Sequence, residues 1–223
     1  MFCEIAVELN GRNVGDSSQL HPYRSIIESL LNYCKKTQQT RLLCEGLTQD
    51  TTRHMNVTAV GENNACLNAR AATFARSTVV EFVGRPHTDV FHQDRLIPPN
   101  IDLYIQLMLF LNNFMSKSAA PAQGAVQENY KLVIQSVNFI IRIKQLTSTA
   151  LKAHMELLHL QNIIHHYTRV QMKHLAILTN QTSINFGNIF TGDLPDLVIV
   201  GLVSDADLAG GYQNNLFNFQ NLA

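Results

Sequence analysis

A cluster of histidines is the first candidate site, because imidazole both binds metal ions and titrates near neutral pH. Five of the nine histidines lie close together, at His154, His159, His165, His166 and His174. No H-E-x-x-H spacing occurs, and Glu156 is the one carboxylate at ligand spacing. His154 and His159, five positions apart, diverge on a helix. We therefore predict no metal ion here; the other use of such a cluster is an interface that responds to pH.

The triplet His87-Thr88-Asp89 is the second candidate, and Val90-Phe91-His92-Gln93 follows it. It places an imidazole, a hydroxyl and a carboxylate in one predicted loop. Active sites use all three of these groups. Consecutive loop residues rarely converge on one substrate atom, however. We interpret the triplet as structural.

Acidic side chains flank the last apolar run of the chain, at Asp193, Asp196, Asp205 and Asp207. Paired acids can hydrolyse glycosidic bonds, but acids beside Gly and Pro are more typical of turns, where they hydrogen-bond their own backbone. The sequence also lacks a G-x-S-x-G elbow and a phosphate-binding G-x-x-x-x-G-K-[ST] loop. We predict that the protein is not an enzyme, with no catalytic, cofactor-binding or metal-binding residues, no cofactor and no small-molecule substrate.

The elements that position these groups are predicted from the spacing of apolar side chains. Alternation of apolar and polar residues predicts strands at residues 3–9, 78–83, 101–110, 130–144 and 170–178, and an unbroken apolar run predicts one more at 197–203. The first strand is expected to be half-buried, with Glu4 and Ala6 on its outer face. Asn10-Gly11 follows as a hairpin turn, since both residues tolerate positive φ. The run at 197–203 suits a strand that is covered on both faces.

Helical spacing predicts three helices, at residues 21–36, 64–76 and 148–160, with a polar loop over 37–62. The buried face of the first helix is expected to consist of Ile26, Ile27, Leu30, Leu31 and Cys34. Asn63 or Asn64 can cap the second helix. Strands mixed with about three short helical insertions, and without a regular βαβ order, favour a mainly β protein. The predicted fold class is an antiparallel β-sandwich.

Composition narrows the possible partners. With 46% hydrophobic residues, 15% charged residues and 17 positive against 17 negative side chains, the chain can bury a sizeable core but has no basic excess for nucleic acid. No apolar run approaches the roughly 18 residues of a membrane span. The cysteines Cys3, Cys34, Cys44 and Cys66 form no C-x-x-C pair and no leader is evident, so we expect free thiols in an intracellular, not secreted, protein.

Several motifs occur in a characteristic order. Near the C-terminus, Asn188-Ile189-Phe190-Thr191-Gly192-Asp193-Leu194-Pro195 precedes the apolar run, and Gly210-Gly211-Tyr212-Gln213-Asn214-Asn215-Leu216-Phe217-Asn218-Phe219 follows it. Earlier come Leu9-Asn10-Gly11, His21-Pro22-Tyr23-Arg24 and Glu81-Phe82-Val83-Gly84-Arg85-Pro86-His87-Thr88-Asp89. In this order the motifs resemble the major capsid protein of Polinton/Maverick elements (adintoviruses), which belongs to the double jelly-roll, hexon-type family.

The resemblance implies that residues 1–223 are an incomplete N-terminal jelly roll, because family members carry further strands before it and a second jelly roll after it. It implies a structural capsid subunit that assembles as homotrimers into an icosahedral shell, with copies of itself and other capsid proteins as partners. Its place would be the virion capsid inside the host cell. This copy is expected to be truncated, decayed or a partial gene model of an integrated viral element, and non-functional as a shell protein.

Two other classes of function stay open at the level of the sequence. One is a stand-alone jelly-roll module that binds a ligand or a glycan in its loops. The other is a metal-assisted hydrolase that uses the histidines at 154–174. The aromatic residues Phe186, Phe190, Tyr212, Phe217 and Phe219 are expected to pack or to contact another subunit, since they lack the neighbouring positive charge that base stacking needs.

Overall fold

The N-terminal hairpin forms as the sequence predicts. The computed structural model describes residues 1–51, 54–118, 130–162, 164–181, 183–190, 192 and 194–219. Strand β1 (Phe2–Leu9) turns back into β2 (Arg12–Asn13), with φ angles of 50° at Asn10 and 74° at Gly11. Two consecutive positive φ angles are typical of a two-residue hairpin turn, so this prediction is confirmed.

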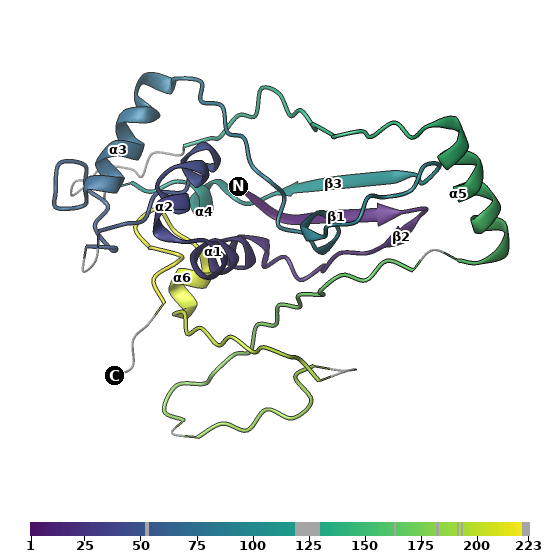
Figure 1. Cartoon of the computed structure of the whole chain (residues 1–223). Coiled ribbons are helices and arrows are strands. Elements are labelled where there is room, and N and C mark those ends of the chain that lie inside the picture. The colour runs from purple at the N-terminus through teal and green to yellow at the C-terminus, as the bar shows by residue number, and fades with distance from the viewer. Residues whose placement is uncertain are drawn as a thin grey trace.

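A third strand completes the sheet. β3 (Leu103–Leu109) pairs antiparallel with the other side of β1, which gives the order β2-β1-β3 (Figure 1). The register places Val7 opposite Ile105 and shifts at an irregularity between Phe2 and Glu4. The strand predicted over residues 101–110 is confirmed.

The centre of β1 is buried on both faces. Glu4 and Ala6, which were expected to face solvent, are each 7% exposed, and their neighbours Ile5 and Val7 are buried as well. Helix α1 (His21–Asn32) contacts β1. Because the central strand has no solvent side, the prediction of a half-buried strand is wrong over these residues.

The three predicted helices are confirmed, and their caps explain where two of them begin. They are α1, α3 (Ala65–Thr73) and α5 (Ser148–Leu160). The Asn64 side chain accepts a hydrogen bond from Leu67 N at 3.2 Å, and Thr147 caps α5 in the same way. Shorter helices are α2 (Lys35–Gln38), α4 (Asn112–Met115) and α6 (Asp205–Ala209), with 3-10 turns η1 (Arg41–Glu45), η2 (Ala75–Ser77) and η3 (Asp89–His92).

Helix α1 buries a different face from the one predicted. Its buried residues include Tyr23, Arg24 and Ser29, whereas Leu31 is 62% exposed and Leu30 is exposed too. Tyr23 enters the aromatic core, and Arg24 pairs with the loop around Asp89. A buried ion pair and an aromatic anchor therefore orient the helix. Of the predicted buried face, Ile26 and Ile27 are half-buried, whereas Leu30, Leu31 and Cys34 are exposed.

The predicted β-sandwich is wrong. The fold is mixed, with 29% helix and 8% strand, and the described residues contain one sheet of three strands. The segments at 78–83, 130–144, 170–178 and 197–203, predicted as strands, pair with no strand in this part of the chain. Alternation of side chains is a local property, but a strand also needs a second backbone beside it to satisfy its N–H and C=O groups. Their sequences meet only the first condition.

The core is aromatic and brings the C-terminal tail back onto α1. Tyr23, Phe114 and Leu216 are its buried centre. Partly buried side chains surround it: Leu20, Phe110, Met172, Val203, Leu208, Phe217 and Phe219. The ring centroids of Tyr23 and Phe217 lie 5.6 Å apart in an edge-to-face arrangement, which is a favoured geometry for aromatic pairs. Packing of the aromatic tail is thus confirmed for Phe217 and Phe219.

Asp50 ties together four segments that are distant in sequence. Its carboxylate accepts hydrogen bonds from Arg70, from Asn64 Nδ2 at 3.2 Å, from Lys117 Nζ at 3.4 Å and from Asn215 Nδ2 at 3.2 Å. Burial alone would raise the pKa of Asp50, but the hydrogen bond and charge of Arg70, together with Lys117, hold it below its ordinary value. This cluster fixes the predicted polar loop to the C-terminal tail.

Replacing Asn64 with alanine is expected to lower the free energy of unfolding by about 2–3 kcal/mol. The Asn64 side chain is fully buried; it accepts hydrogen bonds from Thr51 N and Leu67 N and donates to Asp50 and to His54 O. Alanine leaves these partners unsatisfied. Urea unfolding of the full chain measures the change, and the exposed neighbour Asn63 gives the matched control, N63A. Equal stability of N64A and N63A would contradict the assignment of Asn64 as cap and anchor.

Candidate functional site

A buried guanidinium organises the most polar part of the interior. Arg24 and Glu28 lie one turn apart on α1, and Arg24 Nε donates to Glu28 Oε1 at 2.8 Å. On its other side Arg24 Nη2 donates to Asp89 Oδ1 at 2.5 Å, at the start of η3. The side chains of Arg24 and Asp89 are 6% and 1% exposed. A charge this deeply buried requires such partners, so the network fixes the loop of residues 84–92 against α1.

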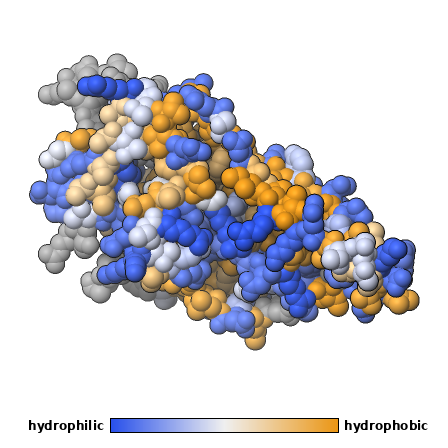
Figure 2. Space-filling model, turned by 45° about the horizontal axis from the view of Figure 1, so that its top comes forward, coloured by the Kyte–Doolittle hydropathy of each residue, from blue (hydrophilic) through white to orange (hydrophobic). Residues whose placement is uncertain are grey.

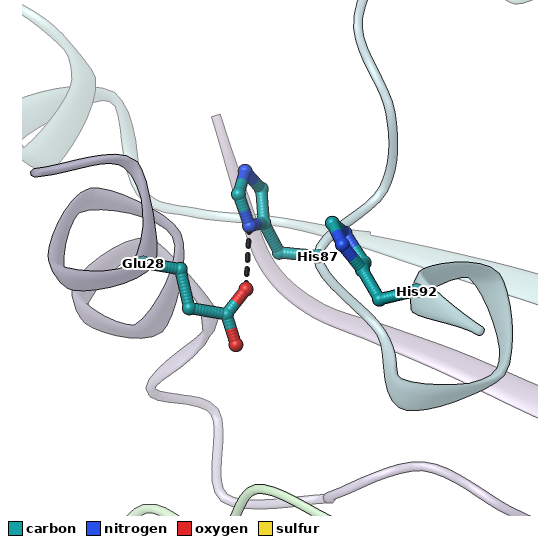
Figure 3. Close-up of side chains that lie close together, drawn as sticks. All are labelled: Glu28, His87 and His92. Carbon is teal, nitrogen blue, oxygen red and sulfur yellow. Dashed lines mark hydrogen bonds and ion pairs between the residues drawn. The ribbon is translucent and has the colours of Figure 1, made fainter. Parts of the chain in front are cut away.

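Two histidines of this loop extend the network toward the surface. His87 Nδ1 lies 2.6 Å from Glu28 Oε2, and the rings of His87 and His92 stack with centroids 5.3 Å apart (Figure 3). His92 Nε2 lies 3.1 Å from the carbonyl oxygen of Pro86. One donor atom each from Glu28, His87 and His92 lie within 4.8 Å of one another. These three side chains form the candidate site.

The electrostatics favour a charged Glu28. Burial would raise its pKa, but hydrogen bonds from His87 and Arg24 and the charge of Arg24 lower it to about 2. Burial raises the pKa of Asp89 above its ordinary value, against the opposing effect of Arg24. The pKa of His92 is lowered by the partial burial of its ring and by the neighbouring His87 and Arg85. Glu28 is therefore ionised at neutral pH.

The triplet His87-Thr88-Asp89 does not converge on one point. His87 turns to Glu28, Asp89 turns to Arg24, and the hydroxyl of Thr88 is buried without a hydrogen-bond partner among the described residues. Asp89 Oδ1 also accepts a hydrogen bond from Val170 N at 3.3 Å, so it holds a later segment of the chain in place. Its role here is to orient the backbone around it.

The five clustered histidines do not come together. His154 and His159 are exposed on α5, and His165, His166 and His174 follow on the irregular segment after it. Within the part of the chain that the structure describes, none of them shares a possible metal site with two other ligands.

Of the acids near the last apolar run, Asp205 and Asp207 begin α6, where Ser204 Oγ accepts a hydrogen bond from Asp207 N at 3.1 Å. Asp193 lies outside the described residues.

Sequence reasoning missed Glu28 and Arg24. Both belong to the first predicted helix, whose aliphatic residues were expected to form its buried face. The available signal was their spacing, because an arginine and a glutamate four positions apart share one face of a helix. Nothing local indicated that His87, 59 positions after Glu28, would meet that face.

An open hollow of about 620 Å³ lies beside the aromatic core. Tyr23, Phe110 and Met172 supply its apolar wall, and Asp16, Arg169 and Lys173 its charged residues. Asp16 Oδ2 accepts a hydrogen bond from Met172 N at 3.1 Å, so part of the polar rim is already paired. The volume suits a small ligand.

The surface is unusually large and apolar. The chain exposes 17068 Å², whereas a compact monomer of 25.0 kDa exposes about 10,000 Å². Figure 2 shows hydrophobic side chains gathered in a broad area of one face. Exposed large apolar residues are dense over 130–146 and 197–200, where Ile140 is 84% and Val200 is 82% exposed. Exposed apolar side chains at this density are typical of sites of protein association.

Comparisons of this chain with family models, with curated proteins and with solved structures find no match. The resemblance carried by the motifs therefore stays a prediction. Among the helices that the structure describes, none is both long enough and apolar enough to cross a membrane.

Proposed function

We propose that this chain is a structural subunit that assembles with copies of itself, as a capsid protein does. The observation that carries the proposal is the exposed surface, which exceeds that of a compact monomer by about 7,000 Å². An obligate subunit interface covers about 2,000–5,000 Å². The excess is enough for contacts with more than one neighbour, which a closed shell requires.

The segment at 130–146 is the first surface that we assign to a neighbouring subunit. Val133, Val137 and Ile141 share one side of an extended chain, and all three are more than half exposed. No strand pairs with this segment among the described residues. An extended, apolar segment of this kind pairs readily with the edge of another sheet, which would satisfy its backbone and cover its side chains.

The same molecule offers an edge of that kind. β3 is one of the two outer strands of the described sheet, and Tyr104 and Leu109 on it are exposed. Leu30 and Leu31 add an exposed aliphatic stripe on α1. With 17 positive and 17 negative side chains, the surface has no net charge to oppose association or to favour nucleic acid. A second copy of this chain is the partner that these surfaces fit.

Size measurement of the purified chain tests the proposal. We expect wild type to elute as trimers or larger assemblies in light-scattering chromatography. The double variant V137D/I141D should shift the chain at least tenfold toward monomer at the same concentration, because two buried carboxylates would be placed in the interface. The control S136D/N138D adds the same charge to the polar side of the same segment and should assemble like wild type.

Two results would contradict the proposal. One is a monodisperse wild-type monomer with a single sharp thermal transition. The other is equal assembly of V137D/I141D and wild type. A monomer that also bound a small ligand at the hollow beside Tyr23 would favour the binding-module class instead.

A further inference from the structure

Glu28, His87 and His92 come from two separate parts of the chain and bring three good metal ligands together (Figure 3). We propose that they form a site for one divalent transition-metal ion of the zinc type.

The distances come close to those of a bound ion. Ligand atoms about 2.0–2.1 Å from Zn²⁺ in a tetrahedral site lie about 3.3 Å from one another. The three donor atoms already lie within 4.8 Å of each other. The closest pair, Glu28 Oε2 and His87 Nδ1 at 2.6 Å, must open by about 0.7 Å to admit the ion. We expect side-chain rotation to supply this opening and to close the wider separations, which are at most 4.8 Å, toward 3.3 Å.

Hydrogen bonds around the three ligands leave the correct atoms available. His92 Nε2 lies 3.1 Å from the Pro86 carbonyl, to which it donates, so that Nδ1 of the same ring keeps a free lone pair. Arg24 occupies Oε1 of Glu28 and leaves Oε2 for the ion. The proton shared by His87 Nδ1 and Glu28 Oε2 stands where the ion would bind. Metal binding therefore releases that proton to solvent.

Charge and access also fit a cation. Glu28 and Asp89 contribute two negative charges, and Arg24 and Arg85, the latter beside His92, contribute two positive charges, so this partly buried place has no excess positive charge to repel an ion. His92 is exposed, and the Glu28 side chain is 16% exposed, so an ion can enter from solvent. Three protein ligands leave a fourth position for water or for a group from another molecule.

The donor set selects the class of metal. Two imidazole nitrogens and one carboxylate oxygen suit Zn²⁺ and its transition-metal neighbours. Mg²⁺ and Ca²⁺ prefer all-oxygen sites and serve as the discriminating controls. Because the ligands join α1 to the loop of residues 84–92, a bound ion would also fasten these two parts together.

Calorimetric titration of the full chain with Zn²⁺ tests the site. We expect one ion per chain, a rise in the melting temperature with Zn²⁺ and none with Mg²⁺. H92A removes one ligand, and E28Q removes the negative charge of the Glu28 carboxylate. Each substitution should weaken Zn²⁺ binding at least tenfold. The control H154A/H159A removes two exposed histidines of α5 and should bind like wild type.

A further variant separates ligation from packing. H92C loses the stacked ring but keeps a metal ligand, so it should bind Zn²⁺ at least tenfold more tightly than H92A. Equal affinity of H92A, H92C and wild type would overturn the proposal, as would loss of the ion in H154A/H159A. Absence of Zn²⁺ binding by folded wild type would show that Glu28 and His87 share a proton only, and that outcome too would overturn it.

Discussion

Replacing Arg24 with methionine lowers the free energy of unfolding by about 3–5 kcal/mol, the range expected when one partner of a buried ion pair is removed. Methionine keeps much of the volume but takes away the only guanidinium that contacts both Glu28 and Asp89 among the described residues. Asp89, 1% exposed in its side chain, is left as a buried carboxylate with Val170 N as its remaining partner. Guanidinium chloride unfolding of the full chain measures the loss.

Two further variants show that the loss comes from the buried charge. R24M/D89N removes the stranded carboxylate as well, and it should recover about 1–2 kcal/mol relative to R24M. R12M makes the same replacement on β2, where Arg12 is exposed, and should change stability by about 0.5 kcal/mol or less. If R24M and R12M were equally stable, the network would not be what fixes α1 to the loop.

Acidification is expected to remove about 3 kcal/mol of stability through His21 alone. Burial, and then the charges of His87 and Arg24, lower the pKa of His21 from 6.5 to about 4, and its Nε2 is buried without a partner among the described residues. The unfolded chain binds the proton more tightly than the folded chain does. This stability is therefore fully present above pH 6.5, is lost as the pH falls, and is gone below about pH 4.

Unfolding curves between pH 7 and pH 4 check this expectation. H21Q has no group that titrates in this range, so its stability should fall less steeply with acidification than that of wild type. His92, whose pKa is also lowered, keeps part of the slope in both proteins. H159Q, changed on the exposed side of α5, should retain the wild-type slope. Identical slopes for H21Q and wild type would rule out His21 as the source.

The parts of the fold that could be predicted are those that neighbouring residues decide. Asn64 and Thr147 cap their helices with side chains only a few positions away, and Asn10-Gly11 contains its whole turn. The four segments that failed as strands have the correct alternation. Strand pairing also requires a second backbone beside the segment, and the residues of the segment do not indicate whether that backbone is there.

The candidate site could not be predicted from the sequence for the same reason, because it depends on contacts between segments that are distant in sequence. The type of His87 marks it as a candidate, but its partner Glu28 lies in another element. Arg24, which pairs with Asp89, holds that element against the loop of His87. The clustered histidines show the converse, since closeness along the chain did not place His154 and His165 together in space. A site whose residues come from distant segments can be identified only when the fold is known.

The Asp50 carboxylate accepts a hydrogen bond from the Asn215 amide at 3.2 Å, although the two residues are 165 positions apart in the sequence. At about 5–20 residues per second, a ribosome needs roughly 10–30 s to add the second after the first. Through that interval a nascent chain holds an acidic group whose final amide donor has not yet been synthesised. The hydrogen-bond cluster around Asp50 is therefore completed only after the C-terminal tail has been synthesised.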